Sequence, residues 1–309
     1  MARRRRSVAR KRSRSAATTR KGYRTRRTTS RLVKRRSRTR RMTTKKILNL
    51  ASTKKKDVMI GGTTFPPTAS DVGALTVTSD APAVLLWNAS ARNLSLTPTS
   101  AFEIPGKPQR TASDTYFVGV SDKITIRTDT SNAWRWRRIV FSHKGLIPGF
   151  TDTSDVLRTF YELPTGTGLN AMQRVATALP FALVADLYSF VFRGLGINNI
   201  SATPADWIDP ITAPIDTSRI SVMYDKTRNI RSGNDAGVVS THRLYHPVKR
   251  TIHYGDHEIA GSMTSSPLST TAKPGIGDIY VMDIIIGNSG DAGDSLDWLP
   301  TSTVYWHEK

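Results

Sequence analysis

The sequence contains no cysteine and, in its first 56 residues, no aspartate or glutamate. The absence of cysteine excludes a disulfide framework and a Cys-based zinc site. The absence of acids leaves 25 of the chain's 46 Lys and Arg residues without a counter-charge in that segment. The other 253 of the 309 residues contain 21 basic and 24 acidic residues. The excess positive charge therefore lies in the N-terminal segment, and the rest of the chain is close to neutral.

Long apolar runs are also scarce. The most apolar stretch, 179–192, is interrupted by Asp186 and is shorter than the roughly 20 residues that a transmembrane helix needs. The first 42 residues contain no apolar core of the kind that a secretory signal peptide has. An Arg- and Ser-rich segment without acids also suits a mitochondrial transit peptide, although the block at 3–6 leaves no amphipathic stripe. We therefore expect no membrane insertion.

Motifs for catalysis are missing. There is no Gly-x-x-x-x-Gly-Lys-Ser/Thr phosphate loop, no Gly-x-Ser-x-Gly turn and no cysteine nucleophile. Two histidine pairs have a four-residue spacing, which places both rings on one face of a helix or a strand. The pairs are His242 with His246 and His253 with His257. Neither pair forms His-Glu-x-x-His and no third ligand is visible, so we predict no enzyme, no cofactor and no metal site.

Three aspartates near the end of the sequence recur at every third position, namely Asp291, Asp294 and Asp297. A calcium-binding EF-hand loop needs acids at alternate positions and a glycine at the sixth, so this pattern does not fit. A calcium ion held at a contact between subunits stays open as an alternative.

What the sequence does contain is a dense run of arginine. Residues 1–41 hold 17 Arg and 3 Lys among Ser and Thr, with isolated apolar residues that follow no period. Such a segment cannot collapse alone, because like charges repel and little apolar surface can be buried. We therefore predict a disordered arm that needs a polyanion. The planar guanidinium of Arg meets two phosphate oxygens at once, so the expected partner is nucleic acid, held by its backbone without a base code.

The candidate nucleic-acid-binding residues are the basic residues of the first 56 positions and two arginines of the body. They are Arg3, Arg4, Arg5, Arg6, Arg10, Lys11, Arg12, Arg14, Arg20, Lys21, Arg24, Arg26, Arg27, Arg31, Lys34, Arg35, Arg36, Arg38, Arg40, Arg41, Lys45, Lys46, Lys54, Lys55, Lys56, Arg135 and Arg137. Basic clusters in the arm also match nuclear-import signals, so host nuclear import receptors are expected as further partners.

The chain divides into three parts by composition. They are a disordered Arg-rich arm at 1–41, a basic hinge at 42–56 and a folded body at 57–309. Within the hinge, the apolar residues Ile47, Leu48 and Leu50 are predicted to anchor the arm to the body.

The body has the patterns of β-structure. The segment 123–127 alternates apolar and polar residues, and 133–142 is the most regular strand. The segment 278–286 is apolar almost throughout, which indicates a central strand buried on both faces. The segment 240–254 is interrupted at Pro247, which suits an edge strand or a bend.

Further short elements fill the rest of the body. Strands are expected at 57–60, 116–120, 157–163, 219–224 and 302–307, and short helices at 170–178 and 183–192. Long loops at 61–114 and 145–218 are expected to form exterior and inter-subunit surface. With roughly eight strands, uneven loops and little helix, the predicted fold is all-β: a single eight-stranded antiparallel jelly roll of two packed sheets.

The strand at 133–142 combines two tryptophans with arginines. Trp134 and Trp136 share one face, and Arg135 and Arg137 share the other. Aromatic rings beside arginines can stack single-stranded bases. We favour the simpler interpretation that the tryptophans belong to the core. For the arginine face, a solvated surface and a surface that meets nucleic acid stay equally open.

Two segments beside these features point to a family. They are Lys-Lys-Ile-Leu-Asn-Leu-Ala-Ser-Thr-Lys-Lys-Lys-Asp-Val-Met at 45–59 and Tyr-Trp-His-Glu-Lys at 305–309. With the arm and the β-rich body, they resemble capsid proteins of genomoviruses, the gemycircularvirus group of small circular single-stranded DNA viruses, related to circoviruses and geminiviruses. The resemblance implies one jelly roll, an icosahedral T=1 shell of about 60 identical subunits, arms inside with the genome, assembly in the host nucleus, and no enzymatic activity.

The sequence therefore favours a structural protein of a virion that packages single-stranded DNA. A cellular basic nucleic-acid-binding protein, ribosomal or nucleoprotein-like, is the main alternative. Such proteins usually spread basic charge through the folded part, whereas this body has slightly more acids than bases. A DNA-processing enzyme with a basic tail would need acid, histidine or metal-ligand clusters that the sequence does not offer.

Overall fold

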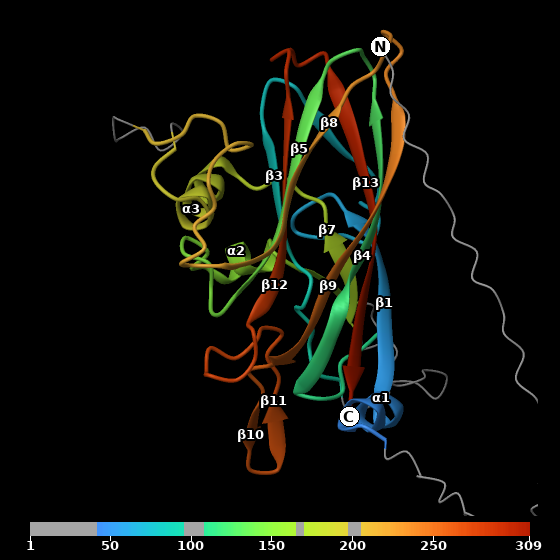
Figure 1. Cartoon of the computed structure of the whole chain (residues 1–309), viewed down its shortest axis with the longest axis vertical. Coiled ribbons are helices and arrows are strands. Elements are labelled where there is room, and N and C mark those ends of the chain that lie inside the picture. Colours follow the sequence, from blue (N-terminus) through green and yellow to red (C-terminus); the bar gives the residue numbers. More distant parts are fainter. Residues whose placement is uncertain (1–41, 96–107, 165–169, 197–204) are drawn as a thin grey trace, which may run out of the picture. The chain divides into compact units, whose positions relative to one another are not determined.

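The computed structural model describes residues 42–95, 108–164, 170–196 and 205–309. Thr44–Lys309 form one compact unit, and the chain before Thr44 belongs to a separate unit. The described part is mainly β-structure in two packed sheets (Figure 1). The prediction of an all-β body with two packed sheets is therefore confirmed.

The larger sheet contains seven strands in the order β6-β7-β1-β13-β4-β9, with β2 paired to β13. Their bounds are β1 Thr53–Gly62, β2 Leu75–Thr78, β4 Asp114–Thr128, β6 Tyr161–Pro164, β7 Asn170–Val175, β9 Val239–His253 and β13 Ser295–Glu308. The strand β9 is at the edge of this order, and its pairing with β4 shifts register beside Pro247. Of the two predicted alternatives, an edge strand or a bend, the edge position of β9 is confirmed.

The smaller sheet has the strand order β3-β12-β5-β8. Its strands are β3 Ala83–Asn88, β5 Trp134–His143, β8 Ser221–Ile230 and β12 Asp278–Gly287. A separate hairpin is made by β10 His257–Ile259 and β11 Ser262–Thr264, and the helices are α1 Thr44–Ala51, α2 Thr153–Leu157 and α3 Phe181–Val191. The described residues thus form thirteen strands rather than eight, because several predicted loops contain short strands.

The two sheets bury alternate side chains against each other. In β13, Leu296, Trp298, Val304 and Trp306 are at most 2% exposed, and the residues between them are largely more exposed. These residues pack with apolar side chains of β3, β5 and β12 from the facing sheet. The period-two pattern arises because successive side chains of a strand point to opposite faces. The larger sheet therefore has one face in the core and one face available to solvent.

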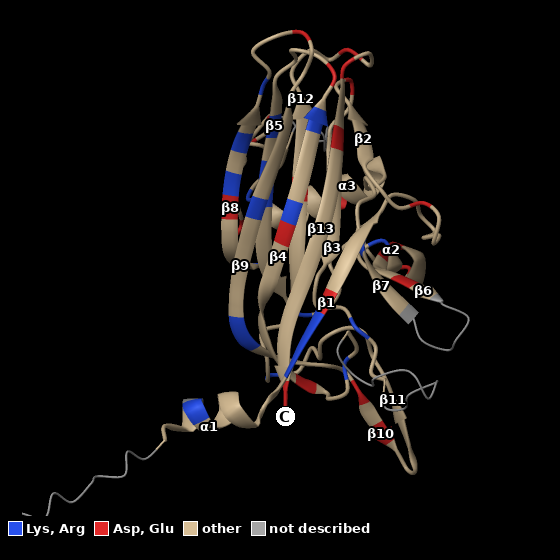
Figure 2. Ribbon diagram, turned by 90° about the vertical axis from the view of Figure 1, so that its right-hand side faces the viewer, with Lys and Arg blue, Asp and Glu red and all other residues tan. Residues whose placement is uncertain are grey.

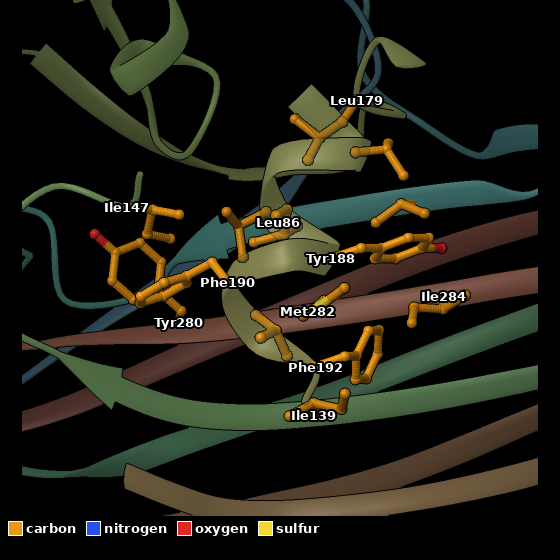
Figure 3. Close-up of a cluster of buried hydrophobic side chains, with 14 of the residues drawn as sticks. Leu86, Ile139, Ile147, Leu179, Tyr188, Phe190, Phe192, Tyr280, Met282 and Ile284 are labelled. Atoms are coloured by element: carbon orange, nitrogen blue, oxygen red, sulfur yellow. The ribbon is translucent and has the colours of Figure 1, made fainter. Parts of the chain in front are cut away.

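The smaller sheet is covered on both faces. The connection between β5 and β8 folds back over its far side and carries α3, whose Leu187 and Tyr188 are buried there. Figure 3 shows Tyr188 and Phe192 beside Met282 and Ile284 of β12. Burial on both faces explains why β12 is apolar almost throughout, as predicted for 278–286. Part of the predicted surface loop at 145–218 therefore belongs to the core.

Several sequence predictions need correction. The segment 170–178 was expected to be a helix, but its first six residues form β7, which pairs with β6 and with the end of β1. The expected strand at 157–163 begins only at Tyr161, because α2 extends to Leu157. The basic hinge at 42–56 consists of α1 and the first part of β1. The helix expected at 183–192 is confirmed as α3.

Candidate nucleic-acid interface

The arm that dominates the sequence prediction is not placed by the structure. All candidate binding residues from Arg3 to Arg41 lie outside the described residues. Those that the structure does place lie in α1, β1 and β5. They are Lys45, Lys46, Lys54, Lys55, Lys56, Arg135 and Arg137.

The helix α1 follows directly on the arm and carries Lys45 and Lys46. Its apolar residues Ile47, Leu48 and Leu50 are 50%, 42% and 78% exposed. The prediction that they anchor the arm is therefore wrong for the single chain, because they bury little surface against the body.

The three lysines of β1 divide between the two faces of the larger sheet. Lys54 and Lys56 are exposed, whereas Lys55 is buried between them. The Lys55 ammonium forms a 2.7 Å ion pair with Glu308 and donates to the Gln109 carbonyl at 3.0 Å. Lys55 is thus a correction to the predicted binding set, since its charge is already neutralised inside the protein.

The arginine pair of β5 is a second correction. The Arg137 guanidinium forms two bonds to Asp225, at 2.9 and 2.8 Å, and donates to two carbonyls of the β5–β8 connection, those of Pro210 and Ala213. Arg135 pairs with Asp209 in the same connection. The two arginines hold this connection and β8 on the smaller sheet, so they do not form a free phosphate-binding row.

The tryptophans of β5 are core residues, as favoured from the sequence. Trp134 and Trp136 are 0% and 1% exposed. The Trp136 indole N–H donates to the Asp283 carboxylate at 2.7 Å. A ring buried in this way cannot stack on a nucleic-acid base.

Between the sheets lies a group of buried charges, which we call the buried ionic cluster: Arg138, Arg174, Asp122 and Asp283. Arg138 bonds both oxygens of Asp283, at 2.7 and 2.8 Å, and also pairs with Asp122. Arg174 approaches Asp283 at 3.1 Å, and its guanidinium lies 4.1 Å from the centre of the Trp87 ring. Two positive and two negative charges neutralise each other, so the cluster joins the two sheets without a net charge.

The pKa values in the cluster follow from burial and neighbours. Burial opposes the ionised form of Asp122, but Arg174 and Arg138 outweigh it and lower its pKa to about 2. Burial also opposes the charge of Arg138, and Asp283 and Asp122 outweigh that effect and raise its pKa. Asp122 and Arg138 are therefore ionised at neutral pH, and the arginines of the cluster serve the fold.

The available positive surface is instead the outer face of the larger sheet. Exposed basic residues occupy outward positions of β1, β4 and β9. They are Lys54, Lys56, Lys123, Arg127 and Arg243. Figure 2 marks the basic residues of these strands in blue. The acids at outward positions of β1, β4, β9 and β13 are Asp114 and Asp297, which bond to His253 and Thr76. We call this surface the basic face.

Two charges of the basic face oppose each other directly. Lys123 of β4 is paired across the ladder with Arg243 of β9. Like charges in directly opposite positions destabilise a sheet. An anion bound over both side chains would relieve that repulsion.

Sequence reasoning missed the basic face because its residues are far apart along the chain. The alternation of 123–127 was recognised as a strand, and it already placed Lys123 and Arg127 on one side. Nothing in the sequence shows that this strand pairs with β9 and β13, which brings Arg243 beside it.

Within the described residues, no group of three or more histidine, aspartate or glutamate side chains has a geometry that could hold a metal ion. No helix of the described part is long and apolar enough to cross a membrane. No protein-family model and no curated protein sequence matches the chain.

Proposed function

We propose that this protein is the capsid protein of a genomovirus-like virus, which assembles into a small icosahedral shell and packages circular single-stranded DNA. The observation that carries the proposal is the separation of charge along the chain. All 25 basic residues of the first 56 positions precede the first acid, and the body that follows is a compact β-sandwich of nearly balanced charge. A tail of this kind binds a polyanion, while a neutral body can pack beside copies of itself.

The strand order supports a jelly roll as the finer description of the body. Eight strands make up the two facing ladders when β2, β6, β7 and the β10–β11 hairpin are set aside. Numbered along the chain, these eight pair in the orders 1-8-3-6 and 2-7-4-5. The first and last strands are thus neighbours, and each sheet draws strands from both halves of the chain. Double-sheet jelly rolls of eight strands occur in viral capsid domains, and also in lectins and cupins.

The charge of the arms suits a single-stranded genome. About 60 subunits in closed symmetry would bring roughly 1,500 positive charges from the first 56 residues, which neutralise on the order of 1,500 phosphates. Small cations would balance the remainder of a genome of a few thousand nucleotides. A flexible single strand also follows an inner lining better than duplex DNA, whose persistence length is about 150 base pairs.

The remaining parts of the proposal follow from this role. The partners are the single-stranded DNA genome, other copies of the chain, and nuclear import receptors that read the basic clusters of the arm. Assembly takes place in the host nucleus, and the product is the virion. The chain has a structural role and no catalytic one.

The test compares the full chain with a variant that lacks residues 1–41. We expect negative-stain microscopy of the full chain to show uniform small shells, with DNA that resists nuclease. The deletion variant should fold, since it retains the whole compact unit, but should protect no DNA. A variant with a shuffled arm of unchanged composition is the matched control, and it should package normally because the arm reads no bases.

Two outcomes would contradict the proposal. Monodisperse monomers that bind DNA without assembling would favour a cellular basic nucleic-acid-binding protein. DNA packaging by the deletion variant would remove the role of the arm.

A further inference from the structure

The basic face contains a hollow at the end where β1 begins. It has a volume of about 490 Å³ and is lined in part by Lys54, Lys56, Ser121, Tyr245, Tyr305 and His307. These side chains come from β1, β4, β9 and β13, four neighbouring strands of the larger sheet. The hollow therefore lies on the compact unit Thr44–Lys309.

Strand register brings aromatic and basic residues together here. Lys56 is opposite Tyr305, and Lys54 is opposite His307. In the neighbouring pair of strands, Ser121 of β4 is opposite Tyr245 of β9. Lysines are thus cross-strand neighbours of aromatic residues, and non-specific sites for single-stranded nucleic acid use this combination of residues.

A glycine leaves room for one of the rings. Gly119 of β4 is opposite Tyr305 and lies where the β4–β9 register shifts. A Cβ at this position would be 2.9 Å from the Tyr245 hydroxyl oxygen and 2.5 Å from the His246 carbonyl oxygen. The bare backbone lets Tyr245 lie across β4, and its side chain remains 51% exposed.

The charge at the hollow comes from its lysines. Burial and the nearby Lys54 ammonium lower the pKa of His307, so its ring is neutral at neutral pH. The Tyr116 ring lies 6.1 Å from the His307 ring and extends the aromatic surface. None of the described residues that line the hollow is acidic.

The hollow continues into the like-charged pair of the basic face. Along β4, Lys123 is two residues beyond Ser121, and along β9, Arg243 is two residues from Tyr245, so all four share one side of the sheet. A chain lying over the hollow can therefore run on towards this pair, whose mutual repulsion favours an anionic occupant.

We propose that this hollow binds single-stranded DNA, with bases stacked on Tyr245 and Tyr305 and phosphates held by Lys54 and Lys56. The bound DNA continues over Lys123 and Arg243. The inference rests on the proposed function and deepens it: the arm gathers the genome, and the body holds short stretches of it in a fixed place. Stacking accepts any base, so the site has little sequence preference.

The first experiment maps contacts in the full chain. A single-stranded oligothymidylate carrying 5-iododeoxyuridine is irradiated with the protein, and cross-linked peptides are identified by mass spectrometry. We expect cross-links in peptides that contain Tyr245 or Tyr305, besides those in the arm. Cross-links confined to residues 1–51, which precede β1, would overturn the inference and leave the proposed function intact. A full chain that binds no single-stranded DNA at all would overturn both.

The second experiment measures affinity at raised salt, where phosphate contacts of the arm weaken and stacking persists. Tyr245→Ala and Tyr305→Ala should each lower the affinity for oligothymidylate roughly fivefold or more. Phe181→Ala, which removes an exposed ring from α3 (71% exposed, against 51% for Tyr245), is the control and should have no effect. Unchanged affinity in both tyrosine variants would overturn the inference. If a variant does not fold, the cross-linking of the unmodified chain decides.

Discussion

At the residue scale, two adjacent arginines of β5 stabilise the fold and are not available to bind nucleic acid. Arg137 and Arg138 are neighbours on β5, yet each is buried and paired with a carboxylate from another strand. A buried charge is tolerated when its partner and hydrogen bonds are in place, and removal of one partner leaves an uncompensated charge. The buried ionic cluster should therefore be sensitive to any single neutral substitution.

Arg138→Met tests this sensitivity. The substitution keeps most of the side-chain volume but removes one of the two arginines that Asp283 and Asp122 share, so Arg174 alone faces two buried carboxylates. We expect the free energy of unfolding to fall by about 3–5 kcal/mol, measured by urea denaturation. Arg243→Met is the matched control, and a change within about 0.5 kcal/mol is expected there because this side chain is exposed. Equal effects of the two substitutions would show that the cluster contributes nothing specific.

His246 makes the stability of the body depend on pH. Its ring is 2% exposed and lies 4.6 Å from the Tyr224 ring, with Arg138, Arg174, Asp122 and Asp283 as its charged neighbours. Burial, assisted by Arg138, lowers its pKa to about 4 from the ordinary 6.5. Between pH 4 and pH 6.5, His246 therefore binds a proton more readily in the unfolded chain than in the folded chain.

Acidification should destabilise the body through His246. The neutral ring contributes its full stability above pH 6.5, and that contribution is lost as the pH falls from 6.5 to 4. His246→Phe keeps a ring against Tyr224 but cannot be protonated. We expect urea denaturation to show a shallower loss of stability across this window in the variant than in the unmodified protein. The same pH slope in both would mean that His246 takes up its proton equally readily in the folded and the unfolded chain.

Single residues also show what the sequence could predict. Trp134 and Trp136 were assigned to the core because large aromatic residues at alternate positions of a strand are usually buried. Arg137 has the same alternation, but the sequence left a solvated surface and a nucleic-acid surface equally open for it, and it was included among the candidate binding residues. Its partner Asp225 lies 88 positions further along the chain. Such a partner follows from strand pairing, which local patterns do not contain.

At the element scale, burial determined which predictions succeeded. The strand at 278–286 was predicted well because β12 is buried on both faces, so its apolar run is uninterrupted. The helix α3 was recognised for the same reason, since its apolar residues fill the far side of the smaller sheet. In contrast, β7 was taken for a helix. Pairing with β6 and β1 overrides the weak local preference of that short segment.

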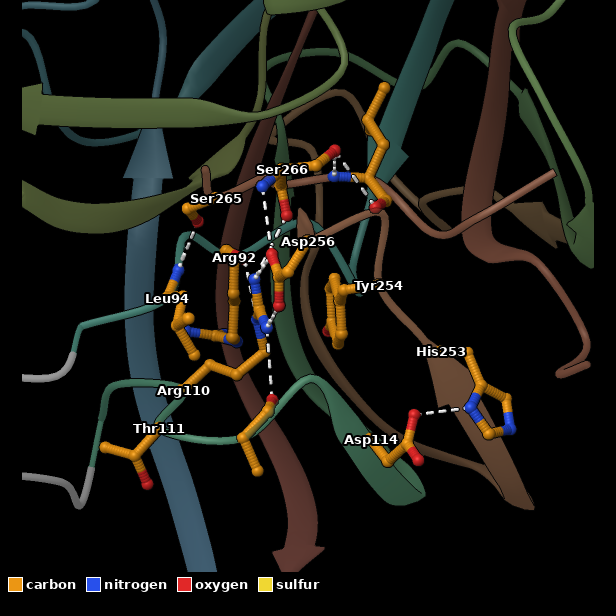
Figure 4. A network of polar contacts seen from close by, with 12 residues as sticks. Arg92, Leu94, Arg110, Thr111, Asp114, His253, Tyr254, Asp256, Ser265 and Ser266 are labelled. Atoms are coloured by element: carbon orange, nitrogen blue, oxygen red, sulfur yellow. Dashed lines mark hydrogen bonds and ion pairs between the residues drawn. The ribbon is translucent and has the colours of Figure 1, made fainter. Parts of the chain in front are cut away.

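The β10–β11 hairpin depends on one arginine. Arg110 is fully buried, and its guanidinium bonds both oxygens of Asp256 and the Ser266 carbonyl, at the two ends of the hairpin. The guanidinium also lies 3.8 Å from the centre of the Tyr254 ring. Figure 4 shows these contacts converging on Arg110. The hairpin itself is exposed in every residue of its two strands, so its attachment to the body lies at its two ends, where this network is.

Arg110→Leu should release the hairpin. The substitution leaves Asp256 buried without its partner, which favours a local opening that lets water reach the carboxylate. We expect amide hydrogen exchange in 255–268 to become at least tenfold faster, while exchange in β12 and β5 changes less. Lys144→Leu, which removes an exposed cation that bonds nearby carbonyls, is the control. Unchanged exchange in 255–268 would show that other contacts hold the hairpin.

At the scale of the whole molecule, the buried basic residues of the body and the basic residues of the arm have different roles. Buried arginines and Lys55 are neutralised one by one by carboxylates of the body, so they add rigidity without adding a field. The arm has no acid within it, so its charge is available to a polyanion. The basic face differs from both: its basic residues are exposed, but they belong to a body whose overall charge is nearly balanced.

This division predicts how binding of single-stranded DNA responds to salt. Each neutralised phosphate releases condensed counterions, and the logarithm of the affinity then falls linearly with the logarithm of the salt concentration, with a slope of about −0.7 per contact. The full chain should therefore show a steep slope, measured by fluorescence anisotropy with oligonucleotides of several sequences. The variant that lacks residues 1–41 should show a much smaller slope, because it keeps only α1 and the basic face. Oligonucleotides of different sequence should give nearly the same affinity. A flat salt response of the full chain, or a strong preference for one sequence, would contradict a mechanism led by phosphate contacts.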